Sequence, residues 1–115
     1  MANGDCLFCR VIAGEIPSRK VFEDDQVFAF EDIQPGAPTH ILIVPKRHIA
    51  DLAAASAADA PLLGHMQIAA AEIARRRQLD GGYRTVFNVG SDAGQSVFHL
   101  HLHLLGGRRL SWPPG

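Results

Sequence analysis

Near its end the chain alternates histidine and leucine for six residues, from His99 to Leu104. In a β-strand, successive side chains point to opposite faces, so this segment would carry three imidazoles on one face and three leucines on the other. The leucine face favours burial, because exposing apolar side chains to water costs free energy. The alternation therefore predicts a strand over residues 97–105 with His99, His101 and His103 in one row.

The rest of the chain divides into two helical segments and four further strands. A short helix is expected over residues 6–13, capped by Asp5 and stopped by Gly14, and an alanine-rich helix over residues 56–79. Strands are expected where Val, Phe and Ile are frequent, at residues 20–23, 27–31, 40–44 and 85–89. We therefore expect an α+β fold with a five-stranded, mainly antiparallel sheet, one short N-terminal helix and one long helix.

Length and composition favour one compact domain over residues 1–115. The sequence is 47% hydrophobic and 20% charged, with a net charge of −1 at pH 7. No strong electrostatic field would then hold the protein on nucleic acid or on an anionic membrane. The longest apolar run, residues 41–44, is too short to cross a bilayer, and residues 1–5 lack the features of a signal peptide. A cytoplasmic location is expected.

The histidine row has two chemical interpretations. Imidazole is a common metal ligand, and its pKa near neutrality also suits nucleophilic and acid–base chemistry. The outer histidines of a regular strand have backbones about 13 Å apart, whereas nitrogens bound to one metal ion lie within about 3.5 Å of each other. The three histidines cannot readily bind one ion, so at least one of them is expected to be free for catalysis.

A loop of small and polar residues, 88–97, leads into the histidine row. Backbone N–H groups near Gly94, Ser96 and Val97 could form a concave site for phosphate oxygens, and the side chains of Asn88 and Ser96 would add donors. An ordinary turn is the alternative. Phosphate binding is favoured because the loop is attached to the histidines.

The segment His99-Leu-His101-Leu-His103-Leu-Leu resembles the signature of the histidine triad superfamily. The resemblance is to its Hint branch, the histidine triad nucleotide-binding proteins, and extends over nearly the whole chain. Its further motifs include Pro38-Thr39-His40, Gly94-Gln95-Ser96-Val97 and Trp112-Pro113-Pro114-Gly115. Hint proteins are homodimers that hydrolyse purine nucleoside phosphoramidates to nucleoside monophosphates. The resemblance therefore implies a purine nucleoside phosphoramidase whose sheet continues into that of a second subunit.

The resemblance also implies a role for each residue of the site. His101 would attack the α-phosphorus and form a covalent nucleotidyl-histidine, His103 would donate to a phosphate oxygen, and Ser96 would lie near the leaving nitrogen. Asp32 would accept both ribose hydroxyls. The other nucleotide contacts would come from Phe8, Ile33, Asn88, Gly94, Gln95 and Val97. As the first histidine of the triad, His99 is a further candidate catalytic residue.

Cys6-x-x-Cys9, with His48 and the histidine row, offers the thiolates and imidazoles of a tetrahedral zinc site. Bacterial-type triad proteins carry such a site, and the resemblance matches its ligands to Cys6, Cys9, His48 and His99. Zinc would then be structural, and His99 would be a ligand that cannot shuttle protons. Buried free thiols are the alternative. His40 is a candidate to orient the histidine row.

Two other functions remain open. One is hydrolysis of dinucleoside polyphosphates, as in the fragile-histidine type, and the other is nucleotide sensing or scaffolding with incidental turnover. The resemblance implies that the tail, residues 110–115, contributes to the active site of the partner subunit. Ser111 stands where eukaryotic members usually have histidine, so the leaving-group preference is expected to differ.

Overall fold

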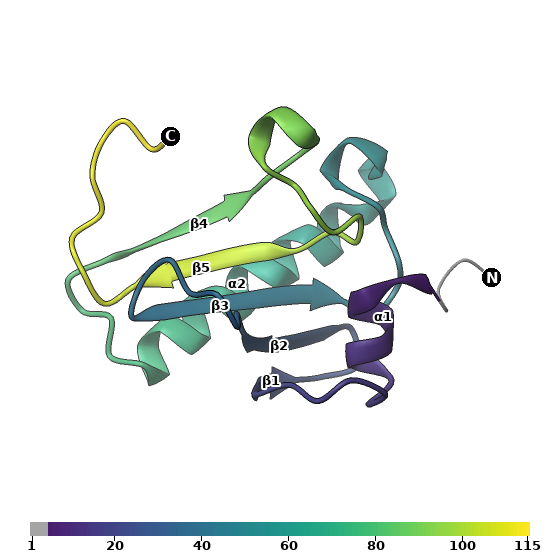
Figure 1. The fold of residues 1–115 in the computed structure, drawn as a ribbon, viewed down its shortest axis with the longest axis horizontal. Coiled ribbons are helices and arrows are strands. Elements are labelled where there is room, and N and C mark those ends of the chain that lie inside the picture. Colours follow the sequence, from purple (N-terminus) through teal and green to yellow (C-terminus); the bar gives the residue numbers. More distant parts are fainter. Residues whose placement is uncertain (1–4) are drawn as a thin grey trace.

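The computed structural model describes residues 5–115, which form one five-stranded antiparallel sheet with two α-helices (Figure 1). The strands, in chain order, are β1 (Lys20–Glu23), β2 (Val27–Glu31), β3 (Thr39–Pro45), β4 (Tyr83–Phe87) and β5 (Leu102–Gly106). The α-helices are α1 (Leu7–Ile12) and α2 (Ala60–Arg76), and the 3₁₀ turns are η2 (Leu52–Ala54), η3 (Ala57–Asp59) and η4 (Ser91–Ala93). The predicted fold class is confirmed.

The order of strands in the sheet is β1-β2-β3-β5-β4, so β1 and β4 are its edges. Helix α2 lies along one face of the sheet, and α1 lies on the other face near the end of β3 (Figure 1). No helix formed by residues 5–115 is long and apolar enough to cross a membrane.

Each face of the sheet has its own apolar core. Alternate side chains of β2, β3 and β5 pack against α2, including Ile41, Ile43, Leu102 and Leu104, all 0% exposed. The intervening side chains of β2 and β3 form a second cluster with α1, made of Phe8, Val11, Phe28, Phe30, Leu42 and Val44. The apolar run of β3 is unbroken because this strand is buried on both faces.

The predicted strand at residues 97–105 begins too early. β5 starts at Leu102, and residues 97–99 form a bend. In the ladder Ile43 pairs with Leu102, so continued pairing would bring Pro45 opposite residue 100, and proline has no N–H to donate. The Leu100 N–H instead donates to the Ile49 carbonyl at 2.6 Å. His99 therefore leaves the row that the sequence predicts.

Smaller corrections concern the ends of other elements. The expected Asp5 cap is wrong, because Cys6 occupies the N-cap of α1 and its Sγ accepts from the Cys9 N–H at 3.4 Å. The long helix is shorter at both ends than residues 56–79; it starts later because the chain first makes the 3₁₀ turn η3, and it ends at Arg76. Pro61 falls in its first turn, where the missing N–H costs nothing. β4 lies two residues earlier than the predicted strand at residues 85–89.

Candidate active site and metal centre

A cavity of about 310 Å³ opens on the face of the sheet that carries α1. Seven of the expected site residues line it: Phe8, Asp32, Ile33, Ser96, Val97, His101 and His103. One part of the lining is apolar, with Phe8 and Phe30 in edge-to-face contact at 5.5 Å between ring centroids. Asp32 and two imidazoles supply polar groups, so the cavity suits a ligand with an aromatic and a polar part. Leu7, Pro17 and Ser18 also line the cavity, and sequence reasoning gave none of them a role in the site.

His101 is held in one orientation by the chain itself. Its Nδ1 lies 2.7 Å from the backbone carbonyl of His99, and the side chain is 9% exposed. A carbonyl can only accept, so Nδ1 carries the proton, and in the neutral ring Nε2 keeps a free lone pair. The edge of the His101 ring also packs against Phe8, at 5.0 Å between centroids. This arrangement presents an unprotonated nitrogen, as a nucleophilic histidine requires.

His103 is oriented through a chain of hydrogen bonds that begins at a backbone amide. The Gly36 N–H donates to His40 Nδ1 at 2.8 Å, so the neutral His40 ring carries its proton on Nε2. That Nε2 lies 2.9 Å from His103 Nδ1 and 3.4 Å from Asp32 Oδ2. When His40 donates to His103, the His103 proton must lie on Nε2. Asn88 Nδ2, which is 3.5 Å away, is also a donor, so it cannot accept this N–H, and the N–H stays available to a ligand.

This chain of hydrogen bonds also decides the character of the cluster formed by Asp32, His40 and His103. Their ligand atoms lie within 4.8 Å of one another, close enough to surround a metal ion. A metal-binding His40 would need a lone pair on Nε2, but the Gly36 N–H already requires the proton to be there. The cluster is therefore a hydrogen-bonded group that orients His103.

Burial keeps His40 and His103 neutral near pH 7. It lowers the pKa of His103 to about 4, with smaller contributions from the neighbouring His101 and His40. It also lowers the pKa of His40, although the Asp32 carboxylate opposes the effect. Neutral rings are what the tautomer assignments require.

Because the pKa of His103 is low in the folded state, we expect stability to fall as the pH drops from about 6.5 towards about 4. In this window the unfolded chain binds the proton and the folded chain does not. One histidine contributes at most about 1.4 kcal/mol per pH unit. Urea unfolding across this range should show a flatter pH dependence for His103→Asn than for wild type. Equal slopes in the two proteins would contradict a depressed pKa at His103.

In the loop before β5, some of the N–H groups expected to bind phosphate instead donate to carbonyls of the same loop. Gly94, with φ of 88°, donates its N–H to the Ser91 carbonyl at 3.0 Å, and the Gln95 N–H donates to the Gly90 carbonyl at 3.1 Å. Within residues 5–115, no carbonyl or side chain accepts from the N–H groups of Ser96 or Val97. Of the expected backbone donors, Ser96 and Val97 are therefore the ones available to a ligand, and both line the cavity.

Gln95 holds this loop in place through its side chain. The amide is 6% exposed; its Oε1 accepts from the Gly90 N–H at 2.9 Å, and its Nε2 lies 3.0 Å from the Ala50 carbonyl and 3.1 Å from the Val97 carbonyl. Both the oxygen and the nitrogen of the side-chain amide are therefore hydrogen-bonded to backbone groups. The side chain thus orders the loop from within and does not line the cavity.

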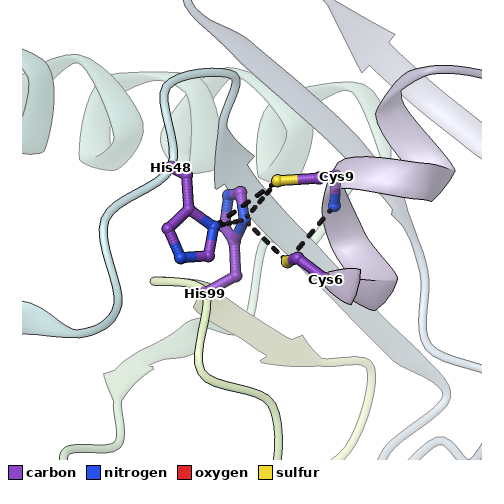
Figure 2. Close-up of side chains that lie close together, drawn as sticks. All are labelled: Cys6, Cys9, His48 and His99. Carbon is purple, nitrogen blue, oxygen red and sulfur yellow. Dashed lines mark hydrogen bonds between the residues drawn. The ribbon is translucent and has the colours of Figure 1, made fainter. Parts of the chain in front are cut away.

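Cys6, Cys9, His48 and His99 converge at the start of α1 (Figure 2). His99 Nδ1 lies 3.3 Å from Cys6 Sγ, 3.5 Å from Cys9 Sγ and 3.1 Å from His48 Nδ1, and Cys9 Sγ is 3.4 Å from His48 Nδ1. In a tetrahedral zinc site, sulfur and nitrogen ligands are separated by about 3.3 to 3.8 Å. The four donor atoms therefore fit a structural zinc ion with little movement.

The surroundings of His99 favour a metal ligand over a catalytic residue. The ring is 0% exposed, and its Nε2 donates to the Pro45 carbonyl at 2.8 Å, which leaves a lone pair on Nδ1 facing the thiols. Burial lowers the pKa of His99 to about 4. Burial, reinforced by the Cys6 thiol, raises the pKa of Cys9 to about 11, and a divalent cation would supply the charge that stabilises a thiolate there.

Comparison with known proteins agrees with this fold. The family model described as scavenger mRNA decapping enzyme C-terminal binding matches residues 5–110. A HIT-like protein of Synechococcus elongatus is 51% identical over 111 residues, which cover 96% of this chain and 97% of that protein. A 14 kDa zinc-binding protein of Zea mays is 48% identical over 111 residues, covering 95% of this chain and 87% of the relative.

Solved structures show the same architecture. A HIT family hydrolase from Legionella pneumophila has a TM-score of 0.94 and 53% identity, covering 96% of this chain and 99% of that chain. A histidine triad nucleotide-binding protein from Candida albicans has a TM-score of 0.80 and 35% identity, covering 94% of this chain and 82% of that one. The sheet, the histidines at its cavity and these matches define a HIT-type hydrolase fold. The chain belongs to the histidine triad (HIT) family.

Proposed function

We propose that this protein is a purine nucleoside phosphoramidase, which cleaves the P–N bond of substrates such as adenosine 5′-monophosphoramidate. The observation that carries the proposal is the fixed tautomer of His101, whose free Nε2 belongs to a side chain lining a nucleotide-sized cavity. The Candida albicans neighbour, described as nucleotide-binding, supports a nucleotide as the ligand. The Legionella pneumophila neighbour supports hydrolysis.

In the proposed reaction His101 Nε2 attacks the α-phosphorus, and the bond to the leaving nitrogen breaks. The leaving nitrogen takes a proton from solvent and departs as an amine, with Ser96 beside it, while the His103 Nε2–H donates to a phosphate oxygen. Water then attacks the phosphorus and returns one proton to solvent, which releases the nucleoside monophosphate and restores His101. One water molecule is consumed for each bond cleaved.

The nucleoside would be bound by the remaining lining of the cavity. The apolar side chains, among them Phe8 and Ile33, would contact the purine, and the Asp32 carboxylate would accept both ribose hydroxyls. The free N–H groups of Ser96 and Val97, together with the Asn88 amide, would bind the phosphate. Gly94 and Gln95 would act by shaping the turn that presents these donors.

We also propose that Cys6, Cys9, His48 and His99 bind a structural zinc ion. The four protein ligands close the coordination shell, so the ion would supply no position for substrate and would act by linking α1 to the segments after β3 and before β5. The zinc-binding relative from Zea mays supports the choice of metal.

The test is a panel of adenosine phosphoramidates, acyl-adenylates and dinucleoside polyphosphates, compared by kcat/KM. We expect the phosphoramidates to be preferred and acid quenching during turnover to trap a nucleotidylated peptide that contains His101. Preference for dinucleoside polyphosphates would favour the related hydrolase activity instead. Tight AMP binding without turnover of any compound would favour a nucleotide sensor.

We further propose a two-fold dimer in which the tail, residues 110–115, borders the partner's site. β4 is an edge strand, and both Ile68 of α2 and Trp112 of the tail are mostly exposed, at 67% and 81%. Deleting residues 111–115 should leave the dimer intact and change selectivity among amine leaving groups, because the helix and strand would hold the subunits together. Solution mass and kcat/KM values measure the two effects. A monomeric wild type would contradict the dimer, and unchanged selectivity would remove the tail from the site.

A further inference from the structure

We propose that Arg108 is a positioning residue for His103, which it orients through the loop between β2 and β3 and through His40. This inference rests on the proposed phosphoramidase function, in which the His103 Nε2–H donates to a phosphate oxygen. The Arg108 guanidinium donates from Nη2 to the Gly36 carbonyl at 2.9 Å and from Nη1 to the Arg109 carbonyl at 2.9 Å. Arg108 therefore joins the segment after β5 to the residue whose N–H fixes the His40 tautomer.

The backbone itself brings these two segments together. Thr39, the first residue of β3, pairs with Gly106, the last residue of β5 (Figure 1). Gly107 follows with φ of 90°, and a Cβ there would come within 2.9 Å of the Pro38 side chain. Glycine at position 107 therefore lets the turn after β5 lie close against the loop before β3. The next residue, Arg108, starts beside the loop that it contacts.

The loop between β2 and β3 needs such a contact because packing does little to hold it. Residues 33–36 are all exposed, so burial contributes little to fixing their backbone. Nearer the start of the loop, the Gln34 N–H donates to Asp32 Oδ1 at 2.8 Å. At Gly36, the N–H must stay close to His40 Nδ1, and the hydrogen bond from Arg108 restrains the same residue through its carbonyl.

The tautomer of His40 decides whether His103 can donate to the substrate. With the His40 proton on Nε2, His103 accepts on Nδ1 and keeps its own proton on Nε2. With the His40 proton on Nδ1, the His40 Nε2 would accept from His103 Nδ1, and His103 Nε2 would turn a lone pair towards the phosphate. That tautomer loses a donor to the transition state, so kcat should fall more than KM rises. Asp32 Oδ2, 3.4 Å from His40 Nε2, favours the productive tautomer as well, so loss of Arg108 should have a partial effect.

The experiment measures hydrolysis of adenosine 5′-monophosphoramidate by three variants. In Arg108→Ala we expect kcat to fall about tenfold and KM to change by less than about threefold. Arg108→Lys should fall nearly as far, because an ammonium cannot reproduce the planar, two-armed geometry of the guanidinium. Arg109→Ala removes the neighbouring exposed guanidinium but keeps the carbonyl that Arg108 contacts, so it should retain wild-type kinetics. Arg108 is itself exposed, so urea unfolding should show similar midpoints for all three variants.

Two further measurements test the route through His40. In ¹⁵N NMR of the unliganded protein near pH 7, wild type and Arg109→Ala should show a protonated Nε2 and an unprotonated Nδ1 for both His40 and His103. Arg108→Ala should show averaged shifts at both His40 nitrogens, which loss of stability alone would not produce. In a His40→Asn background, Arg108→Ala should lower kcat by less than about twofold, because the residue that transmits its effect is missing.

The outcomes separate this inference from the proposed function. Unchanged tautomers or an unchanged kcat in Arg108→Ala would overturn the inference and leave the proposed function standing. A wild-type kcat in Arg108→Lys would also overturn it, since charge would then suffice, and so would a full tenfold fall in the His40→Asn background. A wild type that cleaves no phosphoramidate would overturn the proposed function instead. The NMR measurement needs no substrate and would still test the effect of Arg108 on His40 and His103.

Discussion

His101→Ala should lower the turnover of adenosine 5′-monophosphoramidate by at least about a thousandfold. The variant lacks the nitrogen that forms the covalent bond, and the other groups around the phosphate cannot replace it. AMP affinity should change by less than about tenfold, because the proposed binding groups are Asp32, the apolar wall and the end of the loop. Single-turnover kinetics and AMP titration measure the two effects independently.

Two matched variants make this result specific to nucleophilic attack. His65→Ala removes a histidine from α2 whose Nε2 lies 2.7 Å from Asp24 Oδ2, away from the cavity, and should retain wild-type turnover. His101→Gln keeps a polar side chain that can still donate to the His99 carbonyl, and it should be as inactive as the alanine variant. Turnover at wild-type rates in either His101 variant would exclude the covalent mechanism and favour direct attack by water.

The sequence predicts the sheet well because its strongest signals are local. The apolar run of β3 reflects burial on both faces, and the leucines at 102 and 104 correctly mark the buried face of β5. The start of β5 was predicted incorrectly because alternation alone does not show where pairing stops. Pairing stops at Pro45, a residue on another strand, and this relation exists only in the folded chain.

The candidate site also depends on relations that exist only in the folded chain. The resemblance to Hint proteins supplies seven of the residues that line the cavity and the four that converge near α1, and it implies a role for each, but not the hydrogen bonds that orient them. His99 leaves the row of histidines and contributes only its carbonyl to His101. The orientation of His103 depends on Gly36, which lies in a loop with no chemical motif of its own. The His40–His103 bond joins residues 63 positions apart and so depends on tertiary structure.

Purified protein should contain about one zinc ion per chain, and Cys6→Ser with Cys9→Ser should destabilise it by about 3 kcal/mol or more. The expected loss is large because the ion would cross-link α1, the segment after β3 and the segment before β5, and its binding free energy adds to the free energy of folding. Serine hydroxyls are poor zinc ligands, so the double variant should lose the ion while keeping almost the same side-chain volume. Elemental analysis and urea unfolding measure metal content and stability.

Chelation provides the control for this prediction. A chelator should lower the melting temperature of the wild type towards that of the double variant and leave the variant unchanged, because only the wild type has an ion to lose. The rate constant for chemistry should fall much less than in His101→Ala, since the proposed ion stabilises the segment that carries the His99 carbonyl and contacts no substrate. Metal-free protein with full stability would identify Cys6 and Cys9 as buried thiols. Complete loss of turnover on chelation, with the fold and AMP binding retained, would instead require a catalytic metal.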